Sequence, residues 1–167
     1  MQNIAYVGVG SNLGDKIKHC NDAIEEIAKC KENTVIKRSS LYRTEPWGKE
    51  DQDWFINCAI KLETSLDVLV LLELLKNIEL KFKSTKKEKW SPRIIDLDIL
   101  FFNDEIIDKP GILVPHPFIQ ERRFVLVPLC EICSELIHPV FNKSVKDLLK
   151  KTSDDKEVIQ LQPKEVE

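Results

Sequence analysis

Apolar and polar residues recur along this chain with two different periods. Short apolar or β-branched runs predict strands at 4–9, 34–42, 55–62 and the second half of 90–102. Apolar residues three or four positions apart predict helices at 15–30, 65–82, 125–132 and 144–151. From Thr152 onward little can be buried. We therefore expect one domain of residues 1–151, followed by a polar, frayed tail of residues 152–167.

Local signals predict where these elements begin and turn. Ser11 or Asn12 is expected near the start of the first helix, and Ser65 resembles the N-cap of the second. The glycine-rich segment 8–14 is close to a dinucleotide-binding fingerprint, but its third glycine comes one residue late. We interpret it as a tight turn. After the strand that ends near residue 102, residues 106–107 are expected to return as its hairpin partner.

Two acidic residues on the strand within 90–102 are the first candidates for chemistry. Successive strand side chains point to opposite faces, so Asp96 and Asp98 share a face, about 7 Å apart. Such carboxylates suit Mg²⁺, which proteins bind through one or two carboxylates together with substrate phosphates. Arg93, just before them, offers a forked phosphate binder. The alternative is a strand with a solvated acidic face.

Composition excludes several classes of function. The net charge of −3 over 167 residues argues against a general nucleic-acid binder, although a small phosphorylated ligand remains compatible with it. No apolar run is long enough to span a membrane, so a cytoplasmic location is expected. The cysteines form an odd set in apolar surroundings, which favours buried free thiols over a metal or redox role. They are Cys20, Cys30, Cys58, Cys130 and Cys133.

Four further features break local rules and are candidates for a site. Asn57 lies in mid-strand, where asparagine is disfavoured, and Glu79 lies near a helix C-terminus, where its charge opposes the dipole. The run 81–89 carries five lysines without apolar periodicity, which predicts a surface loop or a lid over phosphates. His116 is held between two prolines. Each also has an ordinary structural explanation as a solvated residue.

Taken together, these motifs resemble the 6-hydroxymethyl-7,8-dihydropterin pyrophosphokinase family, over residues 4 to about 150. The matching segments, in order, are 10–14 (GSNLG), 40–48 (SLYRTEPWG), 55–57 (FIN), 90–98 (WSPRIIDLD), 114–117 (VPHP) and 122–124 (RRF). The resemblance implies an α+β, ferredoxin-like sandwich with a mainly antiparallel sheet and helices on its faces. It also implies transfer of pyrophosphate from ATP to the hydroxymethyl group of the reduced pterin, which releases AMP.

The resemblance also implies a role for each candidate residue. Asp96 and Asp98 would bind two Mg²⁺ ions and, with Arg93, act in catalysis. Pterin-binding positions would be Thr44, Pro46, Trp47, Phe55, Asn57 and Phe124. ATP-binding positions would be Glu79, Trp90, Arg93, Ile99, His116 and Arg122. The lid would carry Lys83, Lys86 and Lys87, and a monomer is expected, with a dimer as the alternative.

Departures from the family concern the nucleotide side. Ser91 stands where the family usually has Gly or Ala, and Gly111 and Leu113 replace polar residues of some members. The lid has neither the glycine nor the two arginines often found there. Lysine attracts phosphate as a point charge but lacks the bidentate fork of arginine.

Two other functions remain open on the sequence alone. One is a Mg²⁺-dependent nucleotidyl- or phosphoryl-transferase with another acceptor, for which Asp96 and Asp98 would suffice. The other is a non-catalytic ferredoxin-like module that binds ligand without turnover. The set of Phe55, Asn57 and Phe124 favours the pterin enzyme, because a sugar or nucleotide acceptor needs no sandwich between two rings.

Overall fold

The computed structural model describes residues 2–46, 52–82 and 94–166. Its strands are β1 (Asn3–Ser11), β2 (Asn33–Arg38), β3 (Tyr42–Thr44), β4 (Phe55–Thr64), β5 (Asp96–Phe102), β6 (Ile107–Lys109), β7 (Ile112–Val114) and β8 (Val158–Gln160). Its helices are α1 (Lys16–Lys29), α2 (Val68–Lys81), α3 (Arg123–Cys133), α4 (Val145–Lys151), the short α5 (Pro163–Val166) and a 3₁₀ turn, η1 (Ile119–Glu121).

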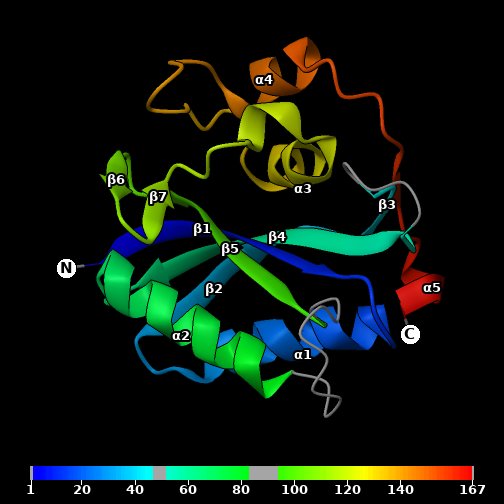
Figure 1. Ribbon diagram of the computed structural model, residues 1–167, viewed down its shortest axis with the longest axis horizontal. Coiled ribbons are helices and arrows are strands. Elements are labelled where there is room, and N and C mark those ends of the chain that lie inside the picture. Colours follow the sequence, from blue (N-terminus) through cyan, green and yellow to red (C-terminus); the bar gives the residue numbers. More distant parts are fainter. Residues whose placement is uncertain (1, 47–51, 83–93, 167) are drawn as a thin grey trace.

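The main sheet is antiparallel and forms the middle layer of a sandwich. Its strands run in the order β5-β1-β4-β3-β8, and β2 also pairs with β4. Helices α1 and α2 cover one face, α3 covers the other, and α4 packs on the outer side of α3 (Figure 1). The expected α+β, ferredoxin-like architecture is therefore confirmed.

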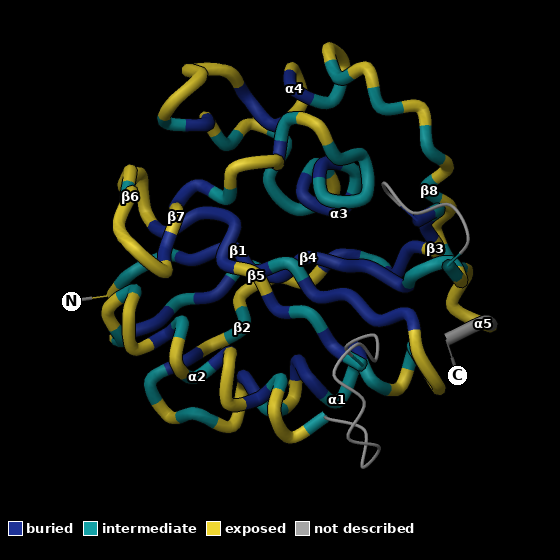
Figure 2. Tube along the Cα trace, in the orientation of Figure 1, coloured by how far each residue is buried: buried dark blue, intermediate teal, exposed yellow. Residues whose placement is uncertain are grey.

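Each face of the sheet has its own apolar core. Leu71, Leu75 and Ile78 of α2 pack with Leu97 and Ile99 of β5 on one face, as the helical and strand periods predicted. The second core joins the opposite face of the sheet to α3 and α4. Figure 2 shows most of the sheet buried between the two helix layers. Leu97 and Ile99 anchor β5 in the core on one face, while Asp96 and Asp98 on its other face line a cavity.

Both predicted helix caps were wrong, for the same physical reason. Ser11 is the last residue of β1, and the cap of α1 is Asp15, whose side chain accepts from the Lys18 amide at 3.2 Å. Ser65 is likewise held outside the helix, and Asp67 caps α2. In each case the preceding strand extends further than its apolar run, since pairing with a neighbouring strand continues past it.

Two strand predictions also needed correction. The run 34–42 forms two strands, because at Ser39 the hydroxyl accepts from the Ala59 amide at 2.9 Å, in place of a regular ladder bond. The segment after β5 does not pair with β5. Instead β6 pairs with β7 in a separate two-stranded sheet.

The polar tail is not frayed in the described part. Residues 158–160 form β8, which pairs with β3 at the edge of the main sheet. The segment runs down one side of the molecule from α4 to α5 (Figure 1). The low hydrophobicity of this segment predicted a frayed tail. The segment is instead ordered because its backbone forms hydrogen bonds with the edge of β3.

The cysteines behave as ordinary thiols. All five are free, and Cys20 and Cys58 are buried, while the other three are partly buried. Burial raises the pKa of the Cys133 thiol to about 12, which keeps it protonated near neutral pH. Among the described helices, none is both long and apolar enough to cross a membrane.

Candidate active site

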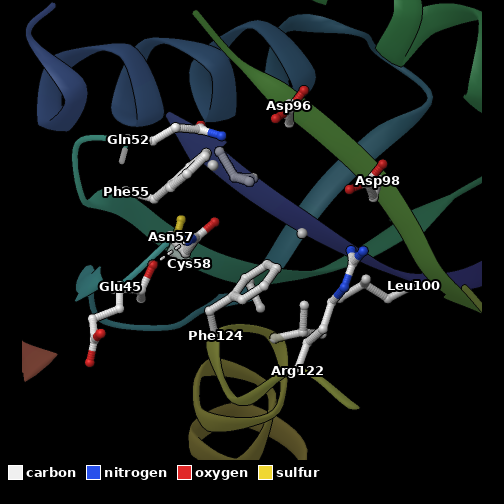
Figure 3. A pocket seen from close by; sticks show the side chains of 16 residues that line it. Glu45, Gln52, Phe55, Asn57, Cys58, Asp96, Asp98, Leu100, Arg122 and Phe124 are labelled. Carbon is white, nitrogen blue, oxygen red and sulfur yellow. Dashed lines mark hydrogen bonds between the residues drawn. The ribbon is translucent and has the colours of Figure 1, made fainter. Parts of the chain in front are cut away.

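A cavity of about 180 Å³ opens between the main sheet and the start of α3 (Figure 3). We call it the first cavity. Its floor is formed by β1, β4 and β5, and one wall by α3. The lining includes Gly8, Gly10, Thr44, Glu45, Gln52, Phe55, Asn57, Asp96, Asp98, Arg122 and Phe124. Seven of the residues proposed from sequence are thus brought together from four separate segments.

Asp96 and Asp98 lie on the cavity face of β5, as the strand period predicted. Across the ladder, Asp96 is opposite Gly10 and Asp98 is opposite Gly8. Because glycine has no side chain, the neighbouring strand leaves the space beside both carboxylates open. Asp98 is exposed and Asp96 is partly buried, so neither carboxylate is hidden in the core. The pair is accessible to a ligand that enters the cavity.

Asn57 sits on the floor in a tight polar arrangement. Its amide nitrogen donates to the Thr44 hydroxyl at 2.8 Å, and both residues are buried. Asn57 also lies opposite Gly10 on β1. A Cβ atom at residue 10 would approach the Asn57 side-chain oxygen to 2.4 Å, so only glycine fits there. The unusual mid-strand asparagine is therefore held in one orientation by its neighbours.

Two aromatic rings and a guanidinium also line the first cavity. Phe55 reaches the cavity from β4, and Phe124 reaches it from α3 (Figure 3). The Arg122 guanidinium lies 4.9 Å from the Phe118 ring and 5.5 Å from the Phe124 ring. Burial lowers the pKa of Arg122 from its ordinary value, while Asp98 acts in the other direction. The cavity thus offers flat apolar surfaces beside a positive charge.

A second cavity, of about 600 Å³, lies between α2, β5 and the β6–β7 hairpin. Its lining includes Leu72, Lys76, Asp98, Ile99, Lys109, Leu113 and His116. Asp98 lines both cavities. Both cavities are therefore bordered by this residue.

His116 presents a defined tautomer toward the second cavity. Its Nδ1 accepts from the Phe118 amide at 3.3 Å, which leaves the proton of the neutral ring on Nε2. Burial lowers the pKa of His116, with a further lowering by Arg122 and a partial compensation by Asp98. The ring is therefore neutral at pH 7 and acts as a hydrogen-bond donor through Nε2.

This lowered pKa predicts acid sensitivity of the fold. The unfolded chain takes up a proton at His116 near pH 6.5, whereas the folded protein does so only at lower pH. The free energy of unfolding should therefore fall as the pH drops below about 6.5. Urea unfolding at pH 7.5, 6.5 and 5.5 should show a smaller fall for His116→Gln than for the unaltered protein. Equal falls in both proteins would contradict the prediction. Some fall in unfolding free energy should remain in His116→Gln, because burial also lowers the pKa of His138.

Glu79 has a different neighbourhood from the other candidates. Its carboxylate accepts from the Leu97 amide at 3.0 Å and lies 4.0 Å from the Lys76 ammonium. It therefore supports the strand between Asp96 and Asp98 from the α2 side, and it does not belong to the lining of either cavity. Its predicted role in ATP binding stays a prediction. Six other candidates lie outside the described residues, namely Trp47, Lys83, Lys86, Lys87, Trp90 and Arg93.

Sequence reasoning assigned no site role to several residues of the first cavity, including Glu45, Gln52 and Gly10. Glu45 and Gln52 line it, and Gln52 accepts from the Asn12 side-chain amide at 3.2 Å. Gly10 was interpreted only as part of a turn, although it makes room for Asn57. Gly10 belongs to a recognisable sequence motif, but the need for glycine at this position follows only from Asn57 on the facing strand.

The donor set fits a magnesium ion shared with a substrate. Among the residues that the structure describes, no three His, Cys, Asp or Glu side chains gather into a complete metal site. Two accessible carboxylates on one strand face are what Mg²⁺ uses when substrate oxygens and water complete its octahedron. Asp96 and Asp98 are therefore the residues that could hold it.

The chain is similar to one known family and to several named proteins. Residues 6–134 match the family described as 7,8-dihydro-6-hydroxymethylpterin-pyrophosphokinase (HPPK). A Bacillus subtilis protein named 2-amino-4-hydroxy-6-hydroxymethyldihydropteridine pyrophosphokinase is 46% identical over 136 residues, which cover 81% of each chain. A Methylorubrum extorquens protein of the same name is 40% identical over 147 residues, 88% of this chain and 92% of its own.

Solved structures agree at the level of the fold. Wild-type Plasmodium falciparum HPPK-DHPS, solved with STZ-DHP, superimposes with a TM-score of 0.73 at 18% identity. The match covers 90% of this chain, which spans only 43% of that longer protein.

Proposed function

The chain belongs to the HPPK family, and on that premise we propose how its two cavities divide the reaction. The reaction transfers pyrophosphate from ATP to the hydroxymethyl group of 6-hydroxymethyl-7,8-dihydropterin in folate synthesis. Since ATP loses its β- and γ-phosphates together, the nucleotide product is AMP. In our proposal the first cavity holds the pterin and the second holds the nucleotide. The observation that carries this division is that Asp98 lines both.

The first cavity has the chemistry that a reduced pterin needs. The flat ring would lie between Phe55 and Phe124, where each offset stacking contact contributes about 0.5–1.5 kcal/mol beyond burial. The polar edge of the ring would meet Asn57, whose carboxamide offers both a donor and an acceptor. Thr44, which lines the cavity, would contact the ligand beside Asn57, and Pro46 and Trp47 are assigned to pterin binding by resemblance to the family.

The second cavity suits an adenine nucleotide. Ile99 and Leu72 give it an apolar surface for the base, while Lys76, Lys109 and the Nε2 proton of His116 offer donors for phosphate and sugar oxygens. Arg122, on the side of the first cavity, would meet the transferred phosphates where the two spaces join. Glu79, Trp90, Arg93 and the lid lysines Lys83, Lys86 and Lys87 complete the nucleotide side by resemblance to the family.

Two Mg²⁺ ions are proposed at Asp96 and Asp98. Bound there, they would neutralise the triphosphate and lower the pKa of the pterin hydroxyl. The chain itself contributes mainly positioning: the stacked ring, the Asn57 contact and the two carboxylates fix the hydroxymethyl group near the β-phosphate. Arg122 and Arg93 would stabilise negative charge that develops on the transferred group.

Identification of the nucleotide product tests the function directly. With dihydropterin substrate, ATP and Mg²⁺, chromatography should detect AMP in equal amount to pterin pyrophosphate. ADP would indicate a phosphoryl transferase with a different bond broken. Ligand binding without any product would indicate a non-catalytic module.

A single substitution tests the assignment of the first cavity. Asn57→Ala removes the hydrogen bonds to the pterin edge but lies outside the second cavity. We expect the pterin KM to rise about tenfold or more, since a lost buried hydrogen bond costs about 1–3 kcal/mol. The ATP KM should stay within about twofold. Equal increases in both KM values would count against the division into two sites.

Two broader properties are also proposed. One is that the protein acts as a monomer, with a dimer as the alternative. Use of ATP supports the cytoplasm as the place of action.

A further inference from the structure

The segment 152–161, which we call the C-terminal strap, contacts both walls of the first cavity. It lies beyond the residues matched by the family profile, which end at 134. On one wall it is bonded to α3, directly beside Arg122 and Phe124. On the other wall it is bonded to the segment that carries Thr44 and Glu45. We propose that the strap is a positioning element for the pterin site and that Asp154 is its principal residue.

The bond to α3 supplies a cap that the helix itself lacks. Arg122 occupies the N-cap position of α3 and makes no side-chain cap hydrogen bond. Asp154 takes over this role from 31 positions along the chain: its carboxylate accepts from the Arg123 amide at 2.8 Å. A carboxylate there satisfies an amide that lacks a partner within the helix and favours the positive end of the helix dipole. This bond stabilises the first turn of α3, which carries Phe124.

A second bond reinforces the same end. The Arg123 side chain donates through Nε to the Lys156 carbonyl at 3.1 Å. Asp154 also accepts from the Lys156 amide at 3.1 Å, so the strap is itself folded into a turn at this point. Residue 123 therefore has its backbone and its side chain tied to the strap, while its neighbours on both sides line the cavity.

Three residues after Asp154, Glu157 of the strap is hydrogen-bonded to the opposite wall. The Glu45 amide donates to the Glu157 carbonyl at 3.1 Å, and the Glu157 amide donates back to the Glu45 carboxylate at 2.9 Å. The pairing continues with Thr44 opposite Val158. Because Thr44 also holds Asn57, the strap links the hydrogen-bonding side of the pterin site to the stacking side. The strap is therefore bonded to both walls within four residues, at Asp154 and at Glu157.

The test compares two adjacent aspartates. Asp154→Ala removes both accepted bonds, whereas Asp155→Ala alters an exposed residue that bonds to none of the described side chains or amides. We expect Asp154→Ala to raise the pterin KM about tenfold while the ATP KM changes less than threefold. Asp155→Ala should match the unaltered protein. Asp154→Asn, which keeps an acceptor oxygen, should restore most of the pterin affinity.

The outcomes separate positioning from simple stability. An unchanged pterin KM in Asp154→Ala, or a parallel rise in both KM values, would overturn the inference. If Asp154→Ala does not fold, Asp154→Asn against Asp155→Asn decides by the same criteria, with about a threefold rise in pterin KM expected.

This inference rests on the pterin site proposed above, and Phe124→Ala distinguishes the two. If Phe124→Ala leaves the pterin KM unchanged, the site assignment is wrong. If Phe124→Ala raises the pterin KM and the Asp154 variants do not, the role of the strap is wrong.

Discussion

Asp96→Asn and Asp98→Asn are each expected to lower kcat for AMP formation by a factor of about 10² to 10³. The substitution keeps the shape of the side chain but removes the charge that a divalent cation requires. Loss of one preorganised electrostatic contact at a reacting centre typically costs a rate factor of this size. Steady-state measurement of AMP release at saturating ATP and pterin checks the expectation.

The two variants should differ from each other in a way that the cavities predict. Asp98 lines both cavities and Asp96 lines only the first. Asp98→Asn should therefore also raise the ATP KM, and Asp96→Asn should leave it closer to that of the unaltered protein. Raising the Mg²⁺ concentration should recover part of the activity in both, because weakened binding is offset by mass action.

The Tm of each variant serves as a control, because it shows whether the loss of kcat comes from unfolding. Both carboxylates face an accessible cavity, and like charges on one strand face repel each other. The Tm should therefore stay the same or rise slightly. Asp104→Asn, in the exposed turn after β5, removes one charge away from the site and should change neither kcat nor Tm. A severe fall in Tm for Asp96→Asn or Asp98→Asn would mean that these residues serve the fold.

Gly10→Ala is expected to damage both the fold and the pterin site. The added methyl group would lie 2.4 Å from the Asn57 side-chain oxygen, closer than any real contact. Overpacking of this kind costs about 1–3 kcal/mol of unfolding free energy, and relief by rotation would break the bond from Asn57 to Thr44. We expect the pterin KM to rise at least tenfold, which steady-state kinetics and urea unfolding can measure together.

Two further variants distinguish a steric clash at Gly10 from a general effect of introducing alanine into β1. At Gly8 on the same strand face, an added Cβ would lie 3.5 Å from Leu100, an ordinary contact, so Gly8→Ala should leave stability unchanged. Combining Gly10→Ala with Asn57→Ala removes the opposing atom. The double variant should therefore be more stable than Gly10→Ala alone, a departure from additivity expected for residues in contact. Additive losses would contradict the proposed clash.

Several parts of the site followed directly from local patterns. The period of two along β5 placed Asp96 and Asp98 on one face and Leu97 with Ile99 on the other, and the structure confirms both. Asn57 stood out because it broke strand propensity. These predictions succeeded because the direction of a strand side chain depends only on its position in the strand.

Other parts could not be read from any local pattern. Pairing partners decided where β1 ended and which residue capped α1, so Ser11 was misassigned. Residue 154 looked like part of a polar tail, yet it caps a helix that begins 31 residues earlier in the chain. Hydrophobicity is a poor guide to such segments, since their order comes from hydrogen bonds to partners that are distant in sequence.

The sequence by itself determined the alternation of strands and helices, the shared face of the two carboxylates and the family to which the motifs point. Only the tertiary structure decided that Asp98 borders two cavities, that Gly10 must lack a side chain, and that the C-terminal strap is bonded to both walls of the first cavity. The physical reason is the sequence separation over which each effect acts. Periodicity and propensity act within a few residues, whereas cavities, steric limits and remote caps arise between segments that meet only when the chain is folded.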